Sequence, residues 1–305
     1  MKQILLTTCL LTLALMMPNS VLADVEISEA NFPDAAFRTV LMTLPEGKDG
    51  VLTDEEIDQL KGLSVTDINH EITSMKGIEF LTKLGVLQCF GTLALGEIDL
   101  TGNHELQHVD IEFSTIKSLN VSGLASLRTL ICTSIFLESL NVAECTALKT
   151  LWCPGGRLTS IDVSDCKQLE SLVCWRNCFT TIDLSANTAL KEVVCYHNNI
   201  SGAGMDALIA SLPIKDTMAD LFIVDSDDPE EENICTTAQA DLARSKNWKV
   251  LDFDYIENGE QSTDMNIIQR FSADGTPYFN LQGRRLTGSP NKGIYIQNGK
   301  KVVIK

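Results

Sequence analysis

The sequence predicts an α/β repeat protein: a solenoid of short strands with a helical amino-terminal cap, αβ repeats at the far end and a small β tail. A regular recurrence of leucine is the first observation behind this fold class. The spacing is 21 residues, at Leu106, Leu127, Leu148, Leu169 and Leu190. Leu84 opens a first copy that is one residue longer. Apolar and polar residues also alternate around Leu151–Cys153 and Ile161–Val163, so each half-copy is expected to supply a short strand.

Each half-copy reads L-x-x-L-x-L-x-x-N/C, and halves of 11 and 10 residues alternate. This pattern resembles a subclass of bacterial leucine-rich repeats. The segment from Ile72 to Ile78, followed by Leu81 and Leu84, resembles the internalin type of repeat and joins cap to solenoid. Physical reasoning agrees, because no half-copy can bury its apolar face alone, whereas stacked copies share one core and pair strands about 4.8 Å apart. We therefore assign residues 63–201 to a leucine-rich-repeat solenoid.

Residues 1–23 have the features of a secretory signal peptide. Lys2 precedes an apolar run, and Val21-Leu22-Ala23 form a small-residue cleavage signal. The mature chain is therefore expected to be secreted or displayed at the cell surface. No second apolar run approaches the roughly 18 residues that a membrane-spanning helix needs. The formal net charge of −17 argues against a nucleic-acid partner, because neutralising phosphates requires a basic face.

Residues 24–62 are expected to form the helical cap, since the open end of a repeat array needs a cover. The apolar side chains suited to closing the core are Phe32, Phe37, Val40 and Leu41. Residues 49–56 resemble the second half of an EF-hand loop, whose last glutamate binds calcium. The positions of the first two carboxylates of such a loop hold Pro45 and Gly47 instead. We favour the alternative, in which Thr53 and Glu56 form a capping box on the following helix.

Residues 202–254 are predicted to close the far end of the solenoid with αβ repeats. The expected elements are a helix over 204–212, a strand over 221–224, a helix over 237–246 and a strand over 250–253. Thr236 and Gln239 are expected to form a capping box on the second helix. The segment 225–232 carries six carboxylates and is interpreted as a solvated loop.

Residues 255–265 read as a polar linker, and residues 266–305 as a carboxy-terminal β tail with a basic balance of charge. Turn dipeptides break this tail into short strands, at Asp274-Gly275, Gln282-Gly283 and Asn298-Gly299. The tail is similar to the type IX secretion sorting domains of secreted Bacteroidetes proteins. That resemblance implies an address function. A structural β-hairpin tail without sorting activity is the alternative.

Five cysteines recur at one inward strand position: Cys89, Cys132, Cys153, Cys174 and Cys195. Ile111 holds that position in another copy, so the site accepts a medium-sized apolar side chain. Cys145 and Cys166 take the turn position that Asn103 and Asn187 take elsewhere, where a hydrogen-bonding side chain can tie the loop backbone. Parallel side chains in such columns have poor disulfide geometry. We therefore expect buried thiols, with disulfides as the second interpretation and a metal cluster as the last.

The segment 104–108 spells H-E-L-Q-H, which matches the zinc metalloprotease signature H-E-x-x-H. That chemistry requires a helix, so that His104 and His108 share one face and Glu105 can activate a metal-bound water. Leu106 is instead a core leucine of the repeat, and a strand is expected to begin near His108. A zinc-dependent hydrolase is therefore only a distant alternative. The sequence predicts no enzyme, no metal and no cofactor.

The candidate binding residues occupy outward strand positions of the first half-copy. Successive coils present Trp152, then Trp175 beside Arg176, then Tyr196 beside His197, with Phe90 at the matching place in the first copy. The second half-copy presents small polar residues at Asp99, Asn120, Asn141, Asp162 and Asp183. Adjacent aromatics at strand spacing can form a platform for sugar rings or for the side chains of a protein partner. Alternatively, these rings stack on one another, or the tail or caps cover them.

These features favour a non-enzymatic scaffold that is secreted or held at the cell surface and binds a protein or a glycan. Solenoids present extended surfaces, which suits binding better than catalysis. A structural protein of the cell envelope, without a specific ligand, is the alternative. The sequence leaves the ligand and the oligomeric state open.

Overall fold

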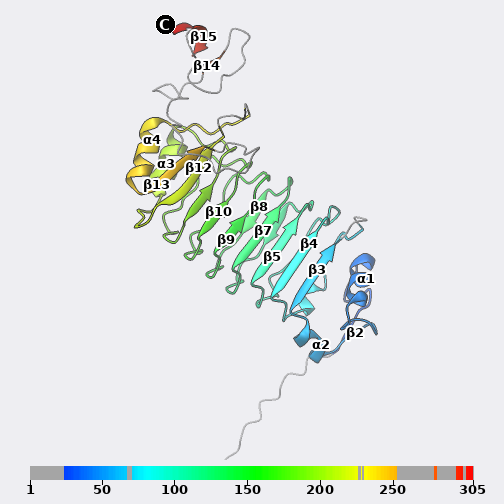
Figure 1. Cartoon of the computed structure of the whole chain (residues 1–305). Helices are drawn as coiled ribbons and strands as arrows, with labels where there is room; N and C mark the ends of the chain where they lie inside the picture. The colour runs from blue at the N-terminus through cyan, green and yellow to red at the C-terminus, as the bar shows by residue number, and fades with distance from the viewer. Residues whose placement is uncertain are drawn as a thin grey trace, which may run out of the picture.

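The computed structural model describes residues 24–66, 71–225, 228 and 230–252, and the backbone of three strands between residues 278 and 304. Its centre is a nine-stranded sheet in which successive coils contribute neighbouring strands (Figure 1). All neighbouring pairs are parallel. The strands are β3 (Gly62–Thr66), β4 (Val86–Phe90), β5 (His108–Glu112), β7 (Thr129–Thr133), β9 (Thr150–Trp152), β10 (Ser171–Val173), β11 (Glu192–Val194), β12 (Ala219–Val224) and β13 (Trp248–Asp252). The fold is a leucine-rich-repeat solenoid of about six turns, as the sequence predicts.

The register of the ladder follows the repeat. Leu151 pairs with Leu130 in the preceding strand and with Leu172 in the next one. From β3 to β12 the inward column is Leu63, Leu87, Val109, Leu130, Leu151, Leu172, Val193 and Leu221. No member of this column is more than 2% exposed. All of them belong to one cluster of buried apolar residues that runs from the cap to the last coil, so the predicted register is confirmed.

The cysteine column lies in this core. Its five members are buried, and Cys89 pairs with Ile111, which pairs with Cys132. The cysteines of the described residues are all free thiols. Burial raises the pKa of Cys89 and of Cys153 to about 12, so both thiols stay protonated and unreactive near neutral pH.

A second column closes the turns by hydrogen bonds, as predicted. The Asn103 side-chain amide donates to the carbonyls of Ile78 and Leu81 at 2.9 and 3.0 Å. The Cys145 thiol donates to the Val121 carbonyl at 3.1 Å. Asn187 and Cys166 make the corresponding bonds to carbonyls of their own neighbouring turns. Each such side chain satisfies buried carbonyl groups that the tight turns leave without a partner.

The sequence predicts a strand in the second half-copy of every coil, but the structure has fewer strands there. Only β6 (Ser118–Asn120) and β8 (Ser139–Asn141) form a ladder there, with isolated bridges in the two preceding coils. Residues 161–163 belong to no strand. An Asp or Asn at the middle of each extended stretch accepts a hydrogen bond from the backbone amide two residues later, at 2.9–3.2 Å: Asp99, Asn120, Asn141, Asp162 and Asp183. The chain therefore turns soon after each of these side chains, and the ladder of β6 and β8 has three residues per strand.

The amino-terminal cap contains α1 (Ala35–Thr43) and α2 (Asp54–Gln59), with β1 (Val25–Glu26) paired to β2 (Val51–Leu52). The side chains of Phe32, Phe37 and Leu41 are fully buried, and Val40 packs against the same core. Thr53 and Glu56 form the predicted capping box on α2. The Glu56 carboxylate accepts from the Thr53 amide at 2.9 Å, so it serves the helix end.

Asp34 fastens this cap to the first coil. One carboxylate oxygen accepts from the Phe37 amide and caps α1. The other oxygen accepts from the Thr73 amide and hydroxyl, both at 2.9 Å, and from the Ser74 amide. These bonds cross 39 residues of sequence, and they lower the pKa of Asp34 against the raising effect of burial.

At the far end, α3 (Ala203–Ser211) and α4 (Thr237–Ser245) cover the last coils, and β12 and β13 extend the sheet (Figure 1). The Thr236–Gln239 capping box on α4 is confirmed. Trp248 is 1% exposed, and its ring nitrogen donates to the Pro213 carbonyl at 2.9 Å. Lys246 donates to three carbonyls at the end of α3, which satisfies groups that the helix leaves open.

Beyond residue 252 the structure describes a separate antiparallel sheet of β14 (Tyr278–Phe279), β15 (Gly293–Gln297) and β16 (Lys300–Ile304). The prediction of short strands in this tail is confirmed for these segments. The predicted linker 255–265 and the predicted leader 1–23 lie outside the described residues. Among the residues that are described, no helix has the length and apolar character needed to cross a membrane.

Candidate functional site on the outer face of the strand ladder

The outward side chains of the sheet form columns, and the strand register corrects one sequence assignment. Trp152 pairs with Ile131 on one side and with Val173 on the other. Trp175 lies two residues after Val173, in the column that also holds Phe90 and Tyr196. The alignment that placed Trp152 beside Trp175 was therefore wrong by two residues. Trp152 lies in the column nearer the centre of the strands.

Trp175 and Tyr196 pack on each other. Their rings are stacked, with centroids 5.7 Å apart and an interplanar angle of 4°. Tyr196 is only 5% exposed, and it also meets the His197 ring in an edge-to-face arrangement with centroids 5.4 Å apart. We call the small group around this stack the outer aromatic cluster; its members are Val173, Trp175, Val194, Tyr196 and Phe222. The two rings of this pair therefore stack on each other, which is one of the two interpretations that the sequence allowed.

Arg176 and His197 occupy the left-handed turn that follows the strands. Their φ angles are 53° and 52°, and glycine holds the same place in two other coils, Gly91 and Gly155. Arg176 donates to Asp228 at 3.1 Å. The His197 side chain is 6% exposed, and its Nε2 atom faces Asp225 and Asp228. Sequence reasoning found no partner for His197 because these carboxylates lie in a different coil.

The acidic loop after β12 is not simply solvated, which corrects the sequence interpretation. Glu231 is 4% exposed. Its carboxylate accepts from the backbone amides of His197 at 3.0 Å, of Asp225 at 2.7 Å and of Asn233 at 2.7 Å. Burial raises the pKa of Glu231, against the lowering effect of those three hydrogen bonds. The loop folds onto the turn because Glu231 supplies an acceptor for the His197 amide, as well as for two amides of the loop segment itself.

Three other large apolar side chains are exposed on successive coils, and sequence reasoning missed two of them. Trp152 is 42% exposed in β9, Phe113 is 63% exposed after β5, and Ile135 is 67% exposed after β7. We call Trp152, Phe113 and Ile135 together the exposed apolar ridge; the register places Trp152 level with Asp110 and Ile131, three residues before Phe113 along the strands. Phe113 has a φ of 55°, although a bulky residue in the left-handed region is strained by about 1–2 kcal/mol. The signal in the sequence was an apolar residue at a turn position where other copies carry glycine.

An acidic pair borders this ridge. Asp110, on the outer face of β5 between Gln88 and Ile131, is 8% exposed. Its Oδ1 atom is buried and has no hydrogen-bond partner among the described residues. Burial raises the pKa of Asp110, and burial followed by the charge of Asp110 raises that of Glu112. A donor from outside the chain would relieve the unsatisfied acceptor.

The H-E-L-Q-H segment does not have the geometry of a zinc protease. Leu106 is fully buried, His104 lies in a turn, and His108 begins strand β5. Glu105 accepts from Lys83 at 2.6 Å. The helix that would bring the two imidazoles onto one face is absent at these residues, so this motif is a coincidence of the repeat.

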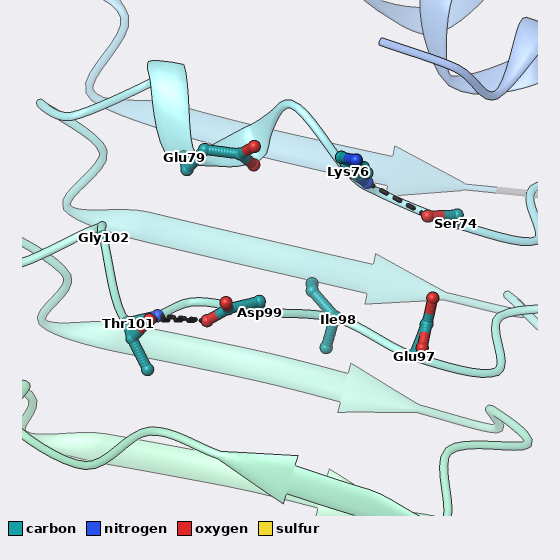
Figure 2. A pocket seen from close by; sticks show the side chains of 8 residues that line it. All are labelled: Ser74, Lys76, Glu79, Glu97, Ile98, Asp99, Thr101 and Gly102. Atoms are coloured by element: carbon teal, nitrogen blue, oxygen red, sulfur yellow. Dashed lines mark hydrogen bonds between the residues drawn. The ribbon is translucent and has the colours of Figure 1, made fainter. Parts of the chain in front are cut away.

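A cavity of about 450 Å³ lies on the second half-copy of the first coils, where Figure 2 shows Glu79, Glu97 and Asp99 around it. Two of its carboxylates already serve the fold. Asp99 accepts from the Thr101 amide and hydroxyl, and Glu79 accepts from the Gly77 amide. The cavity is therefore a product of the turn hydrogen bonds, and the outer face of the ladder is the better candidate site.

The sequence matches no protein-family model and no curated protein. Among solved structures, an internalin C2 from Listeria monocytogenes is similar, with 19% identity over 66% of this chain and 88% of that chain and a TM-score of 0.45. The functional domain of InlJ from Listeria monocytogenes, which includes a cysteine ladder, has 20% identity over 66% of this chain and 57% of its own, with a TM-score of 0.31. A leucine-rich-repeat protein of Leptospira interrogans has 14% identity over 64% of this chain and 61% of its own, with a TM-score of 0.36.

Proposed function

We propose that this protein is a non-enzymatic binding scaffold that recognises a protein through the exposed apolar ridge of Trp152, Phe113 and Ile135. The exposure of these side chains, 42%, 63% and 67%, is the observation that carries the proposal. Large apolar groups at the centre of a contact, surrounded by polar residues, provide most of the binding energy in protein complexes. Strain at Phe113 supports the same conclusion, because glycine would hold that turn at less cost.

A protein ligand fits this surface better than a glycan. The two rings best placed to form a stacking platform, Trp175 and Tyr196, are packed on each other, and Ile135 offers no flat ring at all. Asp110 and Glu112 lie on the same face and would accept hydrogen bonds from a lysine or arginine of the partner. The partner surface that fits is therefore apolar with a basic group at its border.

Binding can be tested with the mature chain displayed against a library of secreted and surface proteins and, in parallel, against a glycan array. The ridge variant combines Phe113→Gly with Ile135→Ala. We expect a protein ligand whose affinity falls at least tenfold in this variant, while Phe113→Gly alone keeps or raises the melting temperature by removing strain. Ile214→Ala is the matched control, because Ile214 is 79% exposed but lies outside the ridge. A ligand that binds the ridge variant as tightly as the native chain, or only a glycan ligand, contradicts the proposal.

We also propose that residues 1–23 export the chain and that the tail directs it to the cell surface. The pattern of Lys2, an apolar run and Val21-Leu22-Ala23 supports the first proposal, and the resemblance of the tail to a sorting domain supports the second. Deleting residues 271–305 in the native host should leave the solenoid folded and change the location of the protein. Unaltered surface localisation would show that the tail is not an address.

A further inference from the structure

A second cluster of polar side chains lies between the turn after β11 and the loop after β12. The Nε2 atom of His197 is 3.3 Å from Oδ2 of Asp225 and 3.1 Å from Oδ2 of Asp228. The side chains are 6%, 14% and 23% exposed, respectively. One ligand atom from each residue lies within 4.8 Å of the other two. Two carboxylate oxygens thus meet at one imidazole nitrogen in a largely buried place.

Hydrogen bonding alone accounts poorly for this arrangement. One imidazole nitrogen carries at most one proton, so it can donate fully to only one of the two carboxylates. Of the two separations, 3.1 Å is within the range of an ordinary N–H···O bond and 3.3 Å lies just beyond it. They match the separation of about 3.3 Å between two ligand atoms of a tetrahedral zinc ion that has bonds of roughly 2.0–2.1 Å. Neighbouring buried carboxylates also need a compensating positive charge.

Bonds to other atoms hold the segments that carry the three residues, although Oδ2 of Asp228 also pairs with Arg176. Glu231 accepts from the backbone amides of both His197 and Asp225, and so fixes two of the residues at once. The Glu230 amide donates to Oδ1 of Asp228 at 2.8 Å, which directs Oδ2 toward the histidine. Such supporting bonds to ligand residues are typical of metal sites. Arg176 is the one described cation that pairs with Asp228, at 3.1 Å.

We propose that His197, Asp225 and Asp228 form a binding site for a divalent transition metal ion of the zinc type. One imidazole nitrogen and two carboxylate oxygens suit Zn²⁺, whereas Ca²⁺ prefers six to eight oxygens. Three protein ligands leave a fourth position for water or for a side chain of a partner. Sequence reasoning predicted no metal here because Asp225 is 28 residues from His197 and no short motif contains both. The proposal does not depend on the apolar ridge.

Zinc titration by calorimetry tests the site, using the mature full-length chain freed of metal by dialysis against a chelator. We expect one equivalent of Zn²⁺ to bind with a Kd of micromolar order. Asp225→Asn combined with Asp228→Asn should weaken this binding at least tenfold. Replacing both His104 and His108 by Gln, or Cys178 by Ser, should leave it unchanged; these are the other histidines, and the one cysteine that is not buried, among the residues that the structure describes.

Arg176→Asn supplies a variant that should strengthen binding. Asparagine tolerates the left-handed turn at this position, and the change frees Oδ2 of Asp228 from a competing cation. Co²⁺ in place of Zn²⁺ should give the visible absorption of a tetrahedral site in the native chain and lose it in the double variant. Circular dichroism confirms that each variant is folded. Absence of zinc binding tighter than about 100 µM, or equal binding by the native chain and the folded double variant, would overturn the proposal.

Discussion

Register, rather than residue type, decides what each tryptophan of the ladder does. Trp152 and Trp175 both point away from the core, yet Trp152 is 42% exposed beside Ile131 and Val173, whereas Trp175 is stacked on Tyr196. The two-residue difference in position places Trp175 next to a coil that carries a tyrosine, Tyr196, in the same column. A tryptophan without such a neighbour stays available to a partner.

Truncating each tryptophan separates the two roles. Trp175→Ala should lower the free energy of unfolding by roughly 1–3 kcal/mol, because it removes apolar contacts and a ring stack. Trp152→Ala should change it by no more than about 0.5 kcal/mol, as exposed sites do. Urea denaturation followed by circular dichroism measures both. A loss of about 3 kcal/mol for Trp152→Ala would instead place that ring in the core and remove it from the binding ridge.

Elements that depend on residues nearby in the sequence were predicted well, whereas elements that depend on residues far away in the sequence were not. The Thr53–Glu56 and Thr236–Gln239 boxes lie within one helical turn, so both helix starts were found from the sequence. The loop after β12 was misread because its conformation depends on the amide of His197, 34 residues earlier. Pairing in the second half-copy was overestimated for a related reason. Alternation shows that a stretch is extended, but it does not show whether the stretches of neighbouring coils pair: β6 and β8 form a ladder, whereas residues 161–163 belong to no strand.

The Asp residues that accept turn hydrogen bonds in the second half-copy make the stability of the fold sensitive to acid. The Thr101 hydroxyl and amide lower the pKa of Asp99, and the Ser164 amide and hydroxyl lower that of Asp162. A carboxyl whose pKa is lower in the folded chain adds stability above its unfolded pKa of about 3.9, and that stability is lost as pH falls through the folded pKa. These carboxylates therefore contribute fully at neutral pH and progressively less in acid.

Replacing Asp99, Asp162 and Asp183 together by Asn tests this sensitivity. Asparagine already holds the same place as Asn120 and Asn141, and accepts the same kind of bond. We expect near-native stability at pH 7 and a smaller loss between pH 5 and pH 3 than the native chain suffers, measured by urea denaturation at each pH. An equal acid loss in both proteins would show that other carboxyls, such as Asp34, dominate.

All the coils share one continuous core, but the packing couples each coil mainly to its immediate neighbours. Each coil contacts mainly its two neighbours, and the inward column passes without a break from Leu63 in β3 to Leu221 in β12. Disruption of one coil therefore removes the packing partner of the next on each side. The cap at one end and the α3–α4 pair at the other cover the terminal coils, so damage is expected to spread from the site of a change rather than from the ends.

A charge placed inside the column should show this spread. Leu151→Asp buries an unpaired carboxylate between Leu130 and Leu172, at a cost of several kcal/mol, and should unfold the coils of β7, β9 and β10 before the others. Hydrogen exchange, read strand by strand, measures this spread, and circular dichroism reports the overall loss of structure. Thr150→Asp is the matched control, because Thr150 is adjacent in the same strand, points outward and has Thr129 and Ser171 as its neighbours. It should keep native protection and melting. Normal melting of Leu151→Asp would refute the inward register, whereas uniform unfolding of all nine strands would show that the solenoid behaves as a single unit and not as a chain of coupled coils.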